Sequence, residues 1–196
     1  MRKLLKSWEL KLFTDDFLKA NMSIDIFLKV INESTKDGEK IISTENIDNE
    51  ILKLFDKCSG IDAIQITKDA QIRTMAIRVQ FGNVWNTFTI RFKRHTGAKT
   101  EYEKRLEAIQ NEKLYPNLTL QCYLSLDLKE ILSYGLIFTK DLYNQIQNKP
   151  EIVNYKTATE DGNIFMFISF YDLDKILIYE NSKSRYYSIA KNRNGP

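Results

Sequence analysis

The chain has 196 residues, a length typical of one domain or of one domain with an added flap. Its composition is 43% hydrophobic and 28% charged, with 11 Phe and 10 Tyr. This excludes a largely disordered chain, because those side chains supply ample apolar surface for a core. The net charge is only +3, so a nucleic-acid partner is indicated only where the basic residues cluster.

Signals for export or membrane insertion are missing from the sequence pattern. No apolar run approaches the ~20 residues of a membrane-spanning helix, and we expect no membrane association. Ser7, Glu9 and Lys11 interrupt the stretch where an export signal would be apolar. The two cysteines, Cys58 and Cys122, lie far apart and favour reduced, buried thiols. We therefore expect a cytoplasmic protein.

Three regions can be distinguished along the chain. Residues 1–45 are interpreted as an N-terminal helical extension, because apolar side chains recur at spacings of three and four over residues 8–31. The polar stretch that ends this region is the best candidate for a boundary. Residues 46–148 are interpreted as the core, and residues 149–196 as a C-terminal strand extension packed on that core.

The core begins with a second helix, which we expect to end at Gly60. Three segments rich in β-branched residues or alternating in polarity then predict strands: 61–67, 72–81 and 86–94. The short connections predict a hairpin extended into an antiparallel meander. Residues 100–112 predict a helix, in which Thr100 and Glu103 have the spacing of a capping box.

The second half of the chain alternates between strand and helix signals. The predicted strands are 118–126, 131–138, 163–170 and, more weakly, 186–191. A short helix at 139–148 is expected to be capped by Thr139. Because the helix after the third strand can carry a crossover, we expect a mixed β-sheet flanked by helices, in an α/β or α+β fold.

Asp62 stands at the start of the predicted hairpin. A tight turn places it opposite about residue 77, and Arg78 and Gln80 share one face of the second strand. We therefore expect these side chains to gather at one end of the hairpin. A carboxylate beside a basic side chain and an amide is typical of a reaction site, although an Asp–Arg pair on a solvated strand end is the simpler interpretation.

The element order over residues 46–126, with Asp62 heading the hairpin, resembles the restriction-endonuclease-like or PD-(D/E)xK nuclease superfamily. The resemblance covers roughly residues 46–148. In that family two carboxylates and a backbone carbonyl bind Mg²⁺, and a Lys stabilises the attacking water. The resemblance implies Asp62 as a metal ligand. Arg78 stands where the family has its second acid, and Gln80 stands where it has the Lys.

This departure from the family pattern leaves two alternatives. A guanidinium repels a cation, so Arg78 suits a phosphate clamp, while the amide of Gln80 can orient water. The second acid can come from Glu50 or Glu101 on neighbouring helices, although both positions are also explained by helix-surface or N-terminal charge preferences. The other alternative is a nuclease fold that has lost its metal site and only binds.

Basic residues concentrate between the third strand and the following helix. Arg91, Lys93 and His95 share a strand face, and Arg94 and Lys99 come from the loop. Such clusters attract phosphate backbones, and the start of the following helix adds backbone N–H donors. The alternative is a solvated strand edge that basic residues guard against aggregation.

Two functions remain open on these residues. The first is a nuclease-like protein that binds DNA or RNA and hydrolyses phosphodiesters with Mg²⁺, as an endonuclease or exonuclease. The second is a non-catalytic binding or assembly protein on the same fold, with aromatic surfaces for a protein partner or homo-oligomer. The abundance of Lys, Ile and Asn is typical of an AT-rich bacterial or phage genome.

Overall fold

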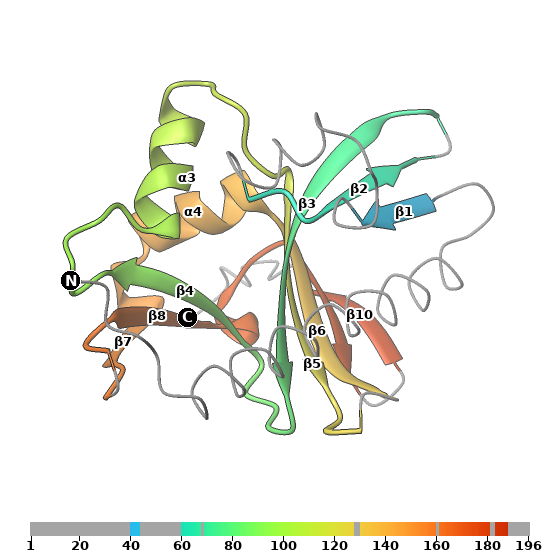
Figure 1. Cartoon of the computed structure of the whole chain (residues 1–196). Coiled ribbons are helices and arrows are strands. Elements are labelled where there is room, and N and C mark those ends of the chain that lie inside the picture. The colour runs from blue at the N-terminus through green and yellow to red at the C-terminus, as the bar shows by residue number, and fades with distance from the viewer. Residues whose placement is uncertain are drawn as a thin grey trace, which may run out of the picture.

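The computed structural model describes residues 40–43, 60–67, 69–127, 130–159, 161–180 and 183–187. Within them the fold is α+β, with a mixed seven-stranded sheet, a three-stranded antiparallel sheet and two α-helices (Figure 1). The predicted α+β class and mixed sheet are therefore confirmed. The helices predicted over residues 8–31 and before Gly60 lie outside the described residues.

The seven-stranded sheet has the order β1-β2-β3-β5-β6-β9-β10. Its strands are β1 (Lys40–Ser43), β2 (Ala63–Ile66), β3 (Ile72–Phe81), β5 (Leu118–Leu124), β6 (Ile131–Phe138), β9 (Ile176–Glu180) and β10 (Lys183–Tyr187). Neighbours are antiparallel except for β3 and β5, which are parallel. The predicted hairpin is confirmed as β2–β3, in which Ala63 pairs with Met75.

The predicted meander is wrong, because the third strand of the core leaves the large sheet. β4 (Thr87–Lys93) pairs with β8 (Ile164–Ser169), which in turn pairs with β7 (Val153–Thr157). The connection from β3 contains two residues with positive φ, Gly82 at 81° and Asn86 at 50°. Both residues adopt the left-handed conformation that is typical of turns, so they lie where the chain changes direction between β3 and β4.

Burial explains why β4 takes this position. Phe88 and Ile90 of β4 are almost fully buried in a core that also contains Met166 and Ile168 of β8. The core includes Tyr123 of β5 as well, so it fills the space between the two sheets. In a β2–β3–β4 meander these aromatic and branched side chains would lack the small sheet as a partner.

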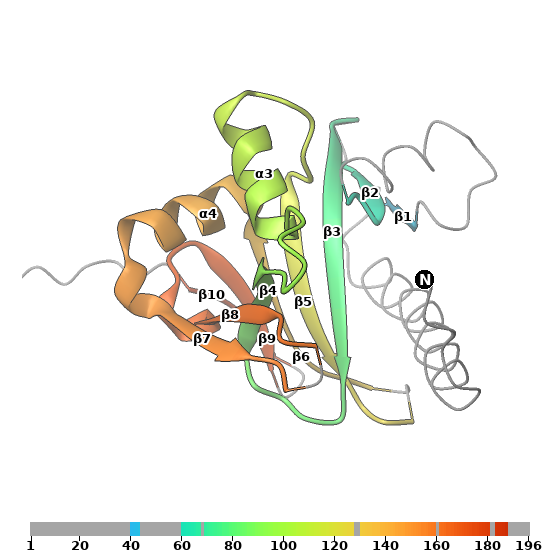
Figure 2. The same cartoon turned by 60° about the vertical axis from the view of Figure 1, so that its left-hand side comes forward.

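The two helices lie on the same side of the large sheet as the small sheet (Figure 2). They are α3 (Glu101–Gln110) and α4 (Thr139–Asn148). The predicted capping box of α3 is confirmed, because the Thr100 hydroxyl accepts from the N–H of Glu103 at 3.3 Å and the Glu103 carboxylate accepts from the N–H of Thr100 at 2.7 Å. Neither described helix is long and apolar enough to cross a membrane.

Thr139 does not cap α4, contrary to the sequence prediction. The N-cap residue is Phe138, and Thr139 is already helical because the helix begins directly after β6. The Thr139 hydroxyl instead lies 2.8 Å from the hydroxyl of Thr119, in a buried contact with β5. Two short 3₁₀ turns complete the described elements, η1 (Pro150–Ile152) and η2 (Phe170–Asp172).

Two close contacts hold the layers together. The hydroxyl of Tyr123 donates to the carbonyl oxygen of Thr87 at 2.7 Å, which ties β5 to the start of β4. On β6, a Cβ atom at Gly135 would lie 2.7 Å from the buried ring of Phe170. Only glycine allows that ring to pack so closely on the sheet.

Three strands were missed by the sequence patterns. β1 falls within the polar stretch read as a boundary, and it extends the sheet by pairing with β2. Only the first residue of β7 is buried, so the strand does not need alternating apolar and polar residues and gives no strand signal in the sequence. β9 has only five residues. The final strand, β10, overlaps the predicted range at residues 186 and 187, and residues 188–191 of that range lie outside the described residues.

Candidate functional site

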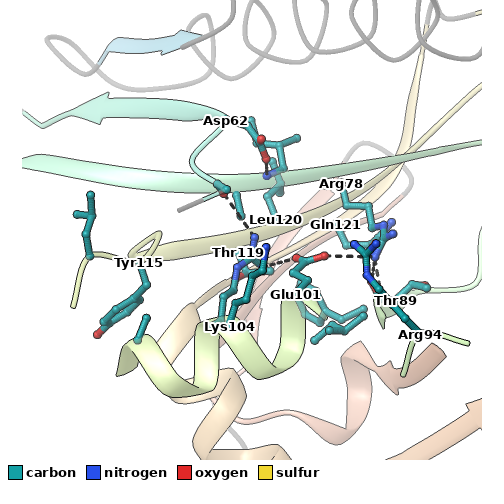
Figure 3. A pocket seen from close by; sticks show the side chains of 18 residues that line it. Asp62, Arg78, Thr89, Arg94, Glu101, Lys104, Tyr115, Thr119, Leu120 and Gln121 are labelled. Carbon is teal, nitrogen blue, oxygen red and sulfur yellow. Dashed lines mark hydrogen bonds and ion pairs between the residues drawn. The ribbon is translucent and has the colours of Figure 1, made fainter. Parts of the chain in front are cut away.

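A cavity of about 400 Å³ lies where β3, β4, β5 and α3 meet (Figure 3). Four cationic side chains line it: Arg78, Arg94, Lys104 and Arg105. Two carboxylates also line it, those of Asp62 and Glu101, so the lining has an excess of positive charge. The connection between α3 and β5 contributes Leu114 and Tyr115.

Strand alternation directs Arg78 to this cavity. Met75 is buried in a second core cluster against which Ile77 and Val79 pack, so Arg78 points to the other face of β3. Its Nη1 donates to the carbonyl oxygen of Thr89 at 2.5 Å. Burial lowers the pKa of the Arg78 guanidinium, and the nearby carboxylate of Glu101 acts in the opposite direction. The side chain nevertheless stays 35% exposed, which leaves it accessible to a ligand.

Glu101 lies between two guanidinium groups. One carboxylate oxygen is 2.5 Å from Nη1 of Arg105, and the other is 4.0 Å from Nη1 of Arg78. Arg105 is only 7% exposed, and its Nη2 also donates to the carbonyl oxygen of Gly60 at 3.4 Å. A largely buried arginine is uncommon and needs an anionic partner.

The burial of Arg105 was missed by the sequence analysis. Tyr102, Leu106 and Ile109 of α3 pack against the main core. Arg105 is three residues after Tyr102 and four before Ile109, so it belongs to the same helical stripe. An arginine within an apolar stripe was the signal that could have identified this residue.

Gly60 supports this arrangement from the other side. It has a φ of 62°, in the left-handed region that glycine adopts without strain. A Cβ atom there would lie 3.3 Å from Nη2 of Arg105. Glycine at this position therefore allows both the positive φ of the backbone and the close packing of the Arg105 guanidinium.

The inner wall of the cavity carries polar atoms without partners. Gln121 is 1% exposed, and its Oε1 accepts from the N–H of Thr89 at 3.4 Å. Its Nε2 and the Oγ1 of Thr89 have no hydrogen-bond partner among the described residues. Since buried polar groups are normally paired, these two atoms favour a site completed by a ligand or by ordered water.

Asp62 lines the same cavity as Arg78, as the hairpin prediction requires. Its carboxylate accepts from the N–H of Ile77 at 2.6 Å, and its own N–H donates to the carbonyl oxygen of Met75 at 2.8 Å. Asp62 therefore closes the open end of the β2–β3 hairpin. Because Ala63 pairs with Met75, Asp62 stands opposite Ala76, one residue from the predicted position.

Gln80, which was also proposed for catalysis, is placed differently from Arg78. Gln80 does not line the cavity, although it follows Arg78 on the same face of β3. Its Oε1 is buried and has no partner among the described residues. Glu50 lies outside the described residues.

The described residues do not fit the magnesium ion that the family resemblance implies. They include no group of three or more His, Cys, Asp or Glu side chains that could hold a metal. Asp62 is engaged by a backbone N–H, and Glu101 faces two guanidinium groups. Mg²⁺ needs several oxygen ligands in octahedral geometry, and adjacent guanidinium groups oppose its charge. This arrangement suits an anion instead.

The basic cluster predicted around β4 divides into separate groups. Only Arg94 lines the cavity, while Arg91 lies over the ring of Phe165 at 5.4 Å, a ring that Arg78 also approaches. Lys99 forms an ion pair with Glu107. Lys93 and His95 are exposed. An irregularity between Arg91 and Lys93 shifts the strand register, so simple alternation fails at the end of β4.

Comparisons of the chain with protein-family models, with curated proteins and with solved structures found no match.

Proposed function

We propose that this protein binds nucleic acid through the cationic cavity, by contacts of arginine and lysine side chains with phosphate oxygens. The position of Glu101 carries the proposal, because its carboxylate already lies between Arg105 and Arg78. Two guanidinium groups around one anionic group are the arrangement that recognises a phosphate. Lys104 and Arg94 add charge to the same cavity.

We also propose that the chain contains a restriction-endonuclease-like core. The hairpin headed by Asp62 and the parallel pair β3–β5, connected through α3, support a restriction-endonuclease-like core. The position of β4 in a second sheet is a departure from the expected meander. We therefore propose a variant of that fold in which the third strand belongs to the small sheet.

The chemistry of the cavity favours binding without hydrolysis. Hydrolysis in the nuclease superfamily depends on carboxylates that hold Mg²⁺. Here the position of the second acid is taken by Arg78, whose charge attracts the phosphate and repels the metal. Asp62 has a structural role at the hairpin end.

Salt-dependent binding tests the proposal. Fluorescence anisotropy of labelled DNA and RNA is measured from about 50 to 300 mM NaCl, a range over which phosphate contacts lose affinity steeply. The variant Lys104→Gln removes one cation from the cavity. The control Lys140→Gln removes one from the exposed surface of α4, outside the cavity lining.

We expect Lys104→Gln to weaken binding several-fold and to reduce the slope of log K against log salt by about 0.7–0.9, the effect of one lost phosphate contact. Lys140→Gln should match the wild type. Absence of binding at low salt, or equal effects of the two substitutions, would overturn the proposal.

A further inference from the structure

The cavity has two chemically different ends. Figure 3 shows Tyr115 at one end and Arg78 and Arg94 at the other. Leu114, which is 52% exposed, lines the cavity beside Tyr115. One end therefore offers an aromatic and aliphatic surface, and the other offers guanidinium groups.

The apolar end is held rigidly by side-chain contacts with β3. The hydroxyl of Thr74 donates to the carbonyl oxygen of Tyr115 at 3.4 Å. The side-chain oxygen of Asn117 accepts from the N–H of Thr74 at 3.0 Å, and the N–H of Asn117 donates back to the Thr74 hydroxyl at 3.1 Å. A connection anchored in this way presents its side chains in a fixed position, which lowers the entropy lost on binding.

A nucleotide has the same two-part chemistry as the cavity. Its base is a flat ring that stacks on aromatic side chains, and its phosphate pairs with guanidinium groups. A cavity of about 400 Å³ is within the range of sites that enclose one small ligand. Resting on the function proposed above, we infer that the cavity takes a nucleotide of an unpaired strand, with the base against Leu114 and Tyr115 and the phosphate among the arginines.

A double helix does not suit this site. In a duplex each base face is covered by its neighbours, and only the base edges are accessible in the grooves. An unpaired base offers its face to Tyr115 at a lower cost of unstacking than a base within a duplex. Stacking is tolerant of base identity, so the inferred preference is for single strands and not for a sequence.

The test compares a labelled single strand with the duplex of the same sequence. We expect the wild-type protein to bind the single strand about tenfold more tightly. Tyr115→Ala should weaken single-strand binding about 5- to 160-fold, the range for loss of one stacked base. Tyr115→Phe keeps the ring and should stay within about twofold of the wild type.

The control for folding is the circular dichroism spectrum of each variant, which should match that of the wild type. Equal affinity of the wild type for single strand and duplex would overturn the inference, as would a single-strand preference that survives Tyr115→Ala. In either case a continued effect of Lys104→Gln would leave the proposed function intact. If the wild-type protein binds neither the single strand nor the duplex, the proposed function itself is refuted.

Discussion

The guanidinium of Arg78 donates to the carbonyl oxygen of Thr89 at 2.5 Å, so a side chain of the large sheet ends on the backbone of the small sheet. The N–H of the same threonine donates to Gln121, which is the register partner of Arg78 on the parallel strand β5. Side chains thus replace the missing backbone ladder between β3 and β4. Arg78, Thr89 and Gln121, which make these contacts between the sheets, also line the cavity.

Asp62 is predicted to stabilise the fold. Asp62→Ala leaves the N–H of Ile77 without its acceptor in a half-buried position. We expect the free energy of unfolding to fall by about 1–3 kcal/mol, the cost of an unpaired buried donor. Urea unfolding followed by circular dichroism measures this loss. Asp62→Asn keeps an oxygen acceptor and should lose less, and equal stability of Asp62→Ala and the wild type would contradict the role.

Glu101 is predicted to compete with the ligand. Its carboxylate occupies Arg105 and approaches Arg78, so Glu101→Gln should free both guanidinium groups for a phosphate. We expect nucleic-acid binding to become about threefold to tenfold tighter, as measured by anisotropy at fixed salt.

The matched control for Glu101 is Glu107→Gln on the same helix. Glu107 pairs with Lys99 and Lys113 and does not line the cavity. Both substitutions change the net charge equally, so only a local effect distinguishes them. If both variants bind equally more tightly, general charge and not competition explains the gain.

Metal removal should leave binding unchanged. Because the described cavity residues do not fit Mg²⁺, we expect the same affinity in EDTA and in millimolar Mg²⁺ at matched ionic strength. Plasmid incubated with the protein and Mg²⁺ or Mn²⁺ should remain uncut. Cleavage by the wild type that Asp62→Ala abolishes would restore the metal hypothesis, and Glu50→Gln would then test the second acid.

The capping box makes stability depend on pH. The backbone N–H and the hydroxyl of Thr100 lower the pKa of Glu103 in the folded protein. The stabilisation is therefore fully present above the ordinary pKa of glutamate and is lost as the pH falls through the lower folded value. We expect Glu103→Ala to lower the melting temperature most at neutral pH, with a difference that shrinks below about pH 4.

The variant Glu103→Gln separates charge from hydrogen bonding at this cap. It keeps an oxygen acceptor for the N–H of Thr100 but cannot ionise. The difference in melting temperature between this variant and the wild type should also become smaller at low pH. Differences that stay constant from neutral to acid pH would show that ionisation of Glu103 has no part in the cap.

Local signals were sufficient for the elements that depend on near neighbours in the chain. The β2–β3 hairpin follows from two alternating segments and a short polar turn, and α3 begins where Thr100 and Glu103 satisfy each other. Alternation along β3 also placed Arg78 and Gln80 on one face of the strand. These outcomes were predictable because each rests on interactions within one strand, one turn or one helix end.

Long-range packing decided the rest. β4 left the large sheet because Phe88 and Ile90 gain a partner in β8, which follows it by some 70 residues in the chain and whose pairing no local pattern indicates. The burial of Arg105 and of Gln121 likewise depends on elements that meet only in the folded protein. Periodicity shows which face of a segment is apolar, but the surface that covers that face is chosen by the free energy of the whole chain.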